Sequence, residues 1–294
     1  MKNLLKKGWI KTILYFATWL LIQFLVFLMI TLVLKFTGSK VNFFQGSTDV
    51  TILMIGSCIQ MLSTLLTTWI FCKYIEKISL KMVGLTWKHK LKDFISGGIL
   101  GIVLISLGSG ILISLGLISI QSFTFNALLL LKSLILFMAV AVNEEVMARG
   151  NILRTLMESM GKYWALLVSA VIFSLLHGLN PGITFIGFTN IFLAGILLGI
   201  YYIHTKNLWF PIGLHLTWNY FQGPVWGYSV SGEEIRGLVT QKLLGIDLLT
   251  GGKFGFEASL ICTIIMVVAI LAIDRMARKI SIPEPLVVES LPEA

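Results

Sequence analysis

Charged residues are scarce in this sequence, since only 13% of its residues are Asp, Glu, Lys or Arg, whereas 56% are hydrophobic. Soluble domains carry about 25% charged residues, so this composition excludes an ordinary soluble enzyme, a coiled coil and a disordered chain. Cysteine is scarce too, and the unpaired spacing of Cys58, Cys72 and Cys262 excludes a disulfide framework or a zinc knuckle. A mean hydropathy of +0.90 indicates a multi-pass protein of the cell membrane.

Acidic residues are the scarcer charge, with 14 Asp and Glu against 23 Lys and Arg and a net charge of +9. In a soluble protein this excess would suggest a nucleic-acid partner. Here the basic residues stand between apolar runs, so the expected partner is the anionic leaflet of the lipid bilayer and no nucleic acid.

Apolar runs are abundant, and eight of them are candidate membrane helices, of which the seventh is short and would have to be tilted or shielded by its neighbours. They cover residues 12–34, 50–72, 94–118, 127–147, 163–180, 183–203, 208–222 and 256–274. The sequence therefore predicts an all-α, polytopic membrane helix bundle of about eight transmembrane helices. Residues 1–280 form one integral-membrane domain, and the tail 281–294, with three prolines, is predicted to be disordered. In the third run, Gly97 and Gly101 have the small-xxx-small spacing of closely packed helices.

The distribution of basic residues predicts the orientation of the bundle. With the N-terminus in the cytoplasm, 17 of the 23 Lys and Arg residues fall in cytoplasmic segments. The other six are Lys35, Lys40, Lys132, Arg236, Lys242 and Lys253. Because cytoplasmic loops carry the excess of Lys and Arg, and because eight spans return the chain to its starting side, both termini are predicted to be cytoplasmic.

Ionisable residues cluster at the end of the fourth apolar run, where each costs about 2.5–3.5 kcal/mol on insertion scales. Glu145 and Arg149 are four residues apart, so they share one helix face and can neutralise each other. Glu144 is rotated away from Arg149 and has no such partner. A charge cluster at the membrane surface is the simpler interpretation of this motif, but it leaves Glu144 unexplained.

Polar side chains in two later runs are the other candidates. His177 ends the motif Phe173-x-x-x-His177, and His215 and Asn219 lie four residues apart, on one helix face. Taken singly, each could be a core residue hydrogen-bonded to a neighbouring helix. The spacing of Glu144 and His177 around the helix breaker Gly161 indicates that the two side chains lie close together. Glu144 lies 17 residues before Gly161 and His177 lies 16 residues after it. In an antiparallel hairpin they reach nearly the same height.

Such a cluster suits hydrolysis of a peptide bond. Glu144 and His177 can polarise a water molecule, and His215 and Asn219 can donate hydrogen bonds to the oxyanion that forms. Glu144, His177 and His215 are equally a ligand set for a catalytic zinc ion. The residue types alone leave open whether zinc or no cofactor is used.

Three motifs in this order resemble one family. Glu144-Glu145-x-x-x-Arg149, Phe173-x-x-x-His177 and His215-x-x-x-Asn219 are similar to the motifs of the CPBP (CAAX protease and bacteriocin-processing, or Abi) intramembrane endopeptidases. The motif core spans about residues 141–222. The resemblance implies an eight-helix protease of peptide or membrane-protein substrates whose site opens towards the cytoplasm. Glu144 and His177 would activate water, His215 and Asn219 would form the oxyanion hole, and Glu145 and Arg149 would support the site.

Two other functions are compatible with a polar cluster in a membrane bundle. In a proton-coupled transporter, Glu144 and His177 would relay protons, although the sequence has no inverted repeat. A catalytically silent immunity or scaffold protein would keep the same fold and bind a peptide partner. The motifs of other intramembrane proteases, His-Glu-x-x-His, Gly-x-Gly-Asp and Gly-x-Ser-x-Gly, are absent from the sequence. The predicted function is therefore an intramembrane endopeptidase.

Overall fold

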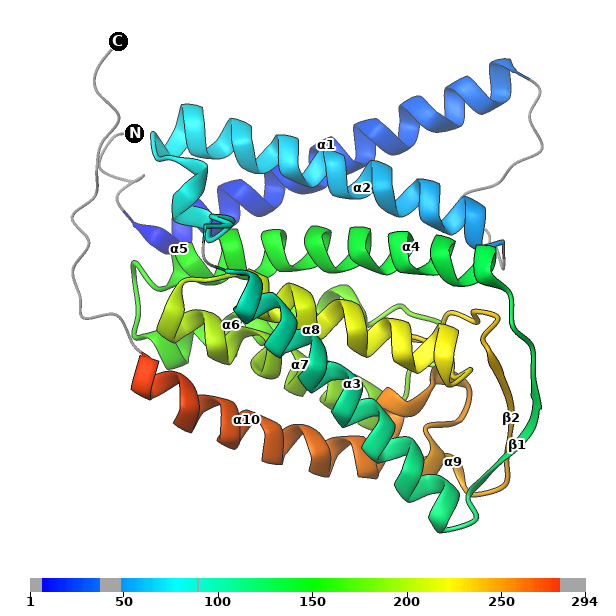
Figure 1. Cartoon of the computed structure of the whole chain (residues 1–294). Coiled ribbons are helices and arrows are strands. Elements are labelled where there is room, and N and C mark those ends of the chain that lie inside the picture. The colour runs from blue at the N-terminus through cyan, green and yellow to red at the C-terminus, as the bar shows by residue number, and fades with distance from the viewer. Residues whose placement is uncertain (1–6, 38–48, 89, 281–294) are drawn as a thin grey trace.

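The computed structural model describes residues 7–37, 49–88 and 90–280, and most of them are helical (Figure 1). Six helices of this part are long and apolar enough to cross a membrane. They are α1 (Gly8–Phe36), α2 (Val50–Ile70, continued by a π-helical turn to Glu76), α3 (Leu91–Ser114), α4 (Ala127–Glu145, continued to Leu156), α7 (Phe185–Thr205) and α10 (Leu260–Ile280). The prediction of a multi-pass helical membrane protein is confirmed. The predicted disordered tail 281–294 lies outside the described residues.

Two of the eight predicted spans correspond to helices that are too short to count among these six. They are α6 (Lys162–Leu176), with 15 residues, and α8 (Trp209–Tyr220), with 12 residues. The sequence Asn180-Pro181-Gly182 is typical of a turn and follows the end of α6. After α8 the chain forms a π-helical turn, Phe221–Val225, that contains Pro224. The predicted count of about eight spans is thus not confirmed.

A two-stranded antiparallel sheet was not predicted, because its strands lie outside or at the edge of the apolar runs. Strand β1 (Ile118–Phe123) pairs with β2 (Val239–Leu243), with Ile118 opposite Leu243 and Phe123 opposite Val239. The third predicted span extended to residue 118, but α3 ends at Ser114. Short helical turns precede α10: α9 (Asp247–Thr250), Gly252–Phe254 and Phe256–Ala258. Helix α10 therefore begins at Leu260, four residues later than the last predicted span.

The motif-bearing helices lie in the middle of the bundle. Helix α4 packs against α2 on one side and against α8 on the other, and its π-helical continuation Val146–Leu153 contacts α6. Figure 1 shows α1 and α2 on one side of this layer and α10 on the opposite side. The sheet and α9 gather at one end, and the start of α1 and the end of α10 lie at the other. This layered arrangement buries α8 and one face each of α4 and α6, whose other faces carry exposed apolar side chains such as Leu128 and Trp164.

Glycine residues bring α3 and α8 into close contact, as the spacing of Gly97 and Gly101 predicts. A Cβ atom at Gly97 would collide with the backbone carbonyl oxygen of Phe210, and one at Gly101 would collide with Thr217. The Thr217 hydroxyl donates a hydrogen bond of 2.8 Å to the carbonyl oxygen of Gly98. Helices α3 and α8 therefore pack through the close approach of their backbones rather than through large side chains. This contact fixes the position of α8.

The predicted orientation can be tested with single cysteines at the two ends of the bundle. The cysteine variants Ser122→Cys, in β1, and Lys88→Cys, before α3, are both made at exposed residues, in a background with the native cysteines replaced by Ala. Because both termini are predicted to be cytoplasmic, an impermeant maleimide on intact cells is expected to label the first variant and not the second. After permeabilisation it labels both. Labelling of Lys88→Cys alone in intact cells contradicts the predicted orientation.

Candidate active site

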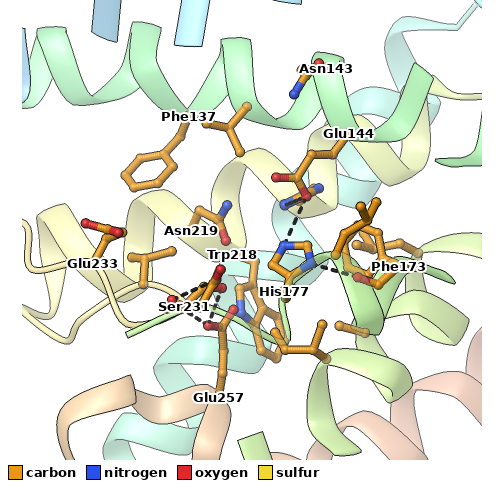
Figure 2. Close-up of a pocket in the computed structure, with 18 of the residues that line it drawn as sticks. Phe137, Asn143, Glu144, Phe173, His177, Trp218, Asn219, Ser231, Glu233 and Glu257 are labelled. Atoms are coloured by element: carbon orange, nitrogen blue, oxygen red, sulfur yellow. Dashed lines mark hydrogen bonds and ion pairs between the residues drawn. The ribbon is translucent and has the colours of Figure 1, made fainter. Parts of the chain in front are cut away.

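A cavity of about 370 Å³ lies among the central helices (Figure 2). Its wall is mainly apolar and includes Phe137, Leu197 and Trp218. Its polar lining residues are Ser57, Gln60, Asn143, Glu144, His177, Asn180, His215, Asn219, Ser231, Glu233 and Glu257. The structure therefore brings the four residues predicted to be catalytic to one cavity, from three different helices.

The Glu144 carboxylate lies between two imidazole rings. Its Oε2 atom is 3.7 Å from Nε2 of His177 and 3.9 Å from Nε2 of His215. These distances are too long for direct hydrogen bonds. The side chain of Glu144 is 21% exposed, and among the described residues no Lys or Arg forms an ion pair with it. The carboxylate is therefore free to act on a molecule in the cavity.

His177 is held by the backbone of its own helix. Its Nδ1 atom lies 2.8 Å from the carbonyl oxygen of Phe173. A carbonyl oxygen only accepts hydrogen bonds, so Nδ1 carries the proton and donates it. In the neutral ring, Nε2 then has its lone pair directed towards Glu144 (Figure 2). The ring is therefore bonded to α6 and not to a neighbouring helix through Nδ1, and Nε2 remains available.

His215 is oriented by the second glutamate of the pair. Its Nδ1 atom is 2.8 Å from Oε1 of Glu145, so the ring donates to a carboxylate through Nδ1 and directs Nε2 into the cavity. Asn219 follows one turn later on α8, is buried, and lines the same cavity. The i, i+4 spacing therefore places the imidazole and the amide on one helix face, as predicted.

Glu145 and Arg149 form the predicted buried pair. Nη1 of Arg149 is 2.9 Å from Oε1 of Glu145, and the side chains are 1% and 0% exposed. Oε1 of Glu145 therefore accepts from both Arg149 and His215. The sequence predicts the contact between Glu145 and Arg149. It does not predict the contact between Glu145 and His215, because these residues lie on two helices and are 70 positions apart in the sequence. Glu145 links the buried cation to the cavity.

Two further contacts hold the Arg149 guanidinium. Nη2 donates a hydrogen bond of 3.0 Å to the carbonyl oxygen of Gly195 on α7. The guanidinium carbon lies 4.5 Å from the ring centre of Phe173, which supports a cation–π interaction. The Phe173 ring is in turn 4.6 Å from the ring of His177. Phe173 thus separates the buried cation from the histidine that faces Glu144.

The hairpin between α4 and α6 explains why Glu144 and His177 meet. The helical run that begins with α4 continues to Leu156, and Gly161 directly precedes α6. The two arms run antiparallel, so the nearly equal separations of Glu144 and His177 from Gly161 bring both residues to the same level, as predicted. The helix widens to a π-helical turn directly after Glu145, a feature that often occurs at functional sites.

A comparison with protein families finds a match for the segment that carries these residues. Residues 124–221 match the family described as type II CAAX prenyl endopeptidase Rce1-like. The family resemblance is confirmed. The matched residues, called the Rce1-like segment below, contain α4, α6, α7 and α8 and all six predicted site residues. Comparison with curated proteins and with solved structures found no match for this chain.

Several polar residues of the cavity were missed by the sequence reasoning, and five of them lie outside the Rce1-like segment. They are Ser57, Gln60, Ser231, Glu233 and Glu257. The only sequence signal was Glu257 itself, a carboxylate within an apolar stretch. Within the Rce1-like segment, Asn180 was missed because turn residues after a helix rarely indicate a cavity. Its side-chain nitrogen donates a hydrogen bond of 3.0 Å to the carbonyl oxygen of Ser231.

The cavity extends from the Rce1-like segment towards the end of the bundle that carries the sheet. Ser231 and Glu233 lie just before β2, and Leu53 and Ser57 lie near the start of α2. If both termini are cytoplasmic, this end faces away from the cytoplasm. The cytoplasmic opening implied by the family resemblance stays a prediction.

The residues proposed as zinc ligands do not form a ligand cluster. The described residues contain no group of three His, Cys, Asp or Glu side chains placed to hold a metal ion. Glu144, His177 and His215 are the right donor types for zinc, and Oε2 of Glu144 lies 3.7 and 3.9 Å from the two imidazole nitrogens. Donors that share one tetrahedral zinc ion lie about 3.4 Å apart, so these separations are compatible with a shared metal ion as well as with a water molecule.

Proposed function

We propose that this protein is an intramembrane endopeptidase that hydrolyses peptide bonds of membrane-associated substrates with a water molecule activated by Glu144 and His177. One observation carries the proposal: a carboxylate that, among the described residues, has no Lys or Arg partner faces the Nε2 atoms of two histidines inside a cavity of a membrane helix bundle. The relation of residues 124–221 to the Rce1-like endopeptidases supports the same reaction class.

The gap between Glu144 and His177 suits a bridging water. At 3.7 Å the two acceptor atoms do not bond to each other, and a polar gap of this kind is where a bridging water is expected. The water donates one hydrogen to the carboxylate and the other to Nε2 of His177, which leaves an oxygen lone pair for attack on the carbonyl carbon. Glu144 takes the proton as the carbon–oxygen bond forms.

The oxyanion that forms has two candidate donors. His215 can donate from Nε2 when its ring carries both protons, because Nδ1 is already bonded to Glu145. The side-chain amide of Asn219 donates from the same helix face. Collapse of the tetrahedral intermediate breaks the carbon–nitrogen bond. Glu144 passes its proton to the leaving nitrogen, so the products are a carboxylate and an amine.

Glu145 and Arg149 are positioning residues in this scheme. Glu145 fixes the tautomer and the direction of the His215 ring through a bond of 2.8 Å. Arg149 neutralises Glu145 and is itself anchored to Gly195 and Phe173. Neither residue contacts the reacting atoms, yet both hold side chains that do.

The proposal is tested by incubating the full chain, purified in detergent micelles, with a mixed library of blocked peptides. New amino and carboxyl termini, identified by mass spectrometry, are the expected result. Since water activation needs only side chains here, exhaustive chelation is expected to leave the rate within about twofold, whereas a zinc enzyme loses its activated water. Cleavage abolished by chelation and restored by zinc contradicts the metal-free scheme, and the absence of any cleavage contradicts the proposed function.

A further inference from the structure

The proposed active site occupies only part of the cavity, and the rest carries two more carboxylates. Figure 2 shows Ser231, Glu233 and Glu257 in the same cavity as Glu144 and His177. Glu257 belongs to the short turn before α10, and Glu233 to the connection before β2. Neither residue lies in the segment that matches a family, and the mechanism proposed above does not use them.

Glu257 is a buried carboxylate with a fixed orientation. Its side chain is 7% exposed, and Oε2 accepts hydrogen bonds from the backbone nitrogen of Ser231 at 2.8 Å and from its hydroxyl at 2.9 Å. Ser231 is fixed in turn by Asn180, which directly follows the His177 turn. Oε1 of Glu257 has no hydrogen-bond partner among the described residues. One half of a buried anion is thus left for an occupant of the cavity.

Carboxylates outnumber cationic groups in the cavity. Among the described residues its lining includes the carboxylates of Glu144, Glu233 and Glu257 and no Lys or Arg, and the two groups that can become cationic, the imidazoles of His177 and His215, face Glu144. In the described part of the chain, neither Glu233 nor Glu257 forms an ion pair. The hydrogen bonds from Ser231 offset only part of the cost of burying the charge of Glu257, so an occupant that brings a cation is favoured over a neutral one.

A buried amide in the same cavity also lacks a partner. Asn219 is 6% exposed, lines the cavity, and forms no hydrogen bond with the described residues. Buried polar groups in proteins are nearly always bonded. Its donors and acceptor therefore face the cavity, where a ligand or water can bond them, and this observation is independent of the charge argument. A peptide backbone that reaches Asn219 lies in the same cavity as the carboxylate of Glu257.

We propose that Glu257, oriented by Ser231 and assisted by Glu233 at the exposed rim, forms a cation-binding subsite that selects peptides carrying an ammonium or guanidinium group near the scissile bond. The inference rests on the proposed function, because it assigns the substrate class of the same site. Lys and Arg side chains suit this cavity, since their apolar stems contact its wall while their charge reaches the carboxylate.

The test uses the full chain in micelles and matched blocked peptides that differ only in having Lys or norleucine at one position. Library cleavage first identifies the position at which a basic residue is preferred. The wild-type ratio of kcat/KM for the Lys peptide over the norleucine peptide is expected to be at least about 30. In Glu257→Gln this ratio falls by about tenfold or more. In Glu234→Gln, which removes the same charge from the exposed neighbour of Glu233, the ratio is unchanged.

A binding measurement separates this inference from the proposed function. A blocked Leu-Lys-Leu tripeptide is expected to raise the melting temperature of Glu144→Ala protein more than its Leu-norleucine-Leu counterpart, and Glu257→Gln removes the difference. Equal cleavage of Lys and norleucine peptides by the wild-type protein overturns the subsite and leaves the endopeptidase intact. Without any cleavage the proposed function fails, and the binding measurement alone decides whether the subsite exists.

Discussion

Glu144→Gln is expected to lower kcat for peptide cleavage by about 10²- to 10⁴-fold, the range typical of a lost general base. Glutamine has nearly the same shape but cannot take a proton from water at neutral pH. Because Glu144 forms no ion pair with Lys or Arg among the described residues and is partly exposed, the variant is expected to fold and to bind substrate with little change in KM. Initial rates on one library-derived peptide measure both constants.

A matched control separates the base from a general charge effect. Glu158→Gln removes the same charge beyond the end of the same helical run, where Glu158 pairs with Lys11 and Arg154 away from the cavity. Its kcat is expected to stay within about threefold of the wild-type value, since peripheral charges affect the site weakly through solvent. Full turnover by Glu144→Gln would remove the base assignment, and an equal loss in both variants would show a nonspecific effect.

The sequence was most informative where helix periodicity alone determines position. The pairing of Glu145 with Arg149, the shared face of His215 and Asn219, and the common level of Glu144 and His177 all follow from residue spacing along helices or a hairpin. These are local relations, so counting residues is sufficient to predict them.

Contacts between distant segments could not be predicted in this way. The bond from His215 to Glu145 depends on how α8 is placed against α4, and the glycine contacts of α3 determine that placement. Glu257 reaches the cavity because the chain between β2 and α10 folds back in short turns, whereas the apolar run 256–274 predicted a membrane helix over this residue. The length of α6 was overestimated for a related reason, because its apolar run does not show the turn that ends the helix at Leu176.

Glu145→Gln is expected to destabilise the protein by about 3–5 kcal/mol, the cost typical of leaving one member of a buried ion pair uncompensated. Arg149 is 1% exposed, so its charge cannot reach water when Glu145 is neutral. Reversible unfolding in mixed detergents, followed by circular dichroism, measures the change. The variant Arg278→Met removes an arginine from an i, i+4 pair with Asp274 at a helix end where the arginine is 60% exposed, and it is expected to have a much smaller effect.

The double variant Glu145→Gln, Arg149→Met distinguishes a charge pair from simple packing. When both charges are removed, no uncompensated ion remains, so the double variant is expected to be more stable than Glu145→Gln alone. Its kcat is nevertheless expected to remain low, because Met cannot bond to Gly195 and the carboxylate that orients His215 is gone. Recovery of stability without recovery of rate assigns Glu145 to positioning. Additive losses of stability would instead show that the two side chains contribute independently.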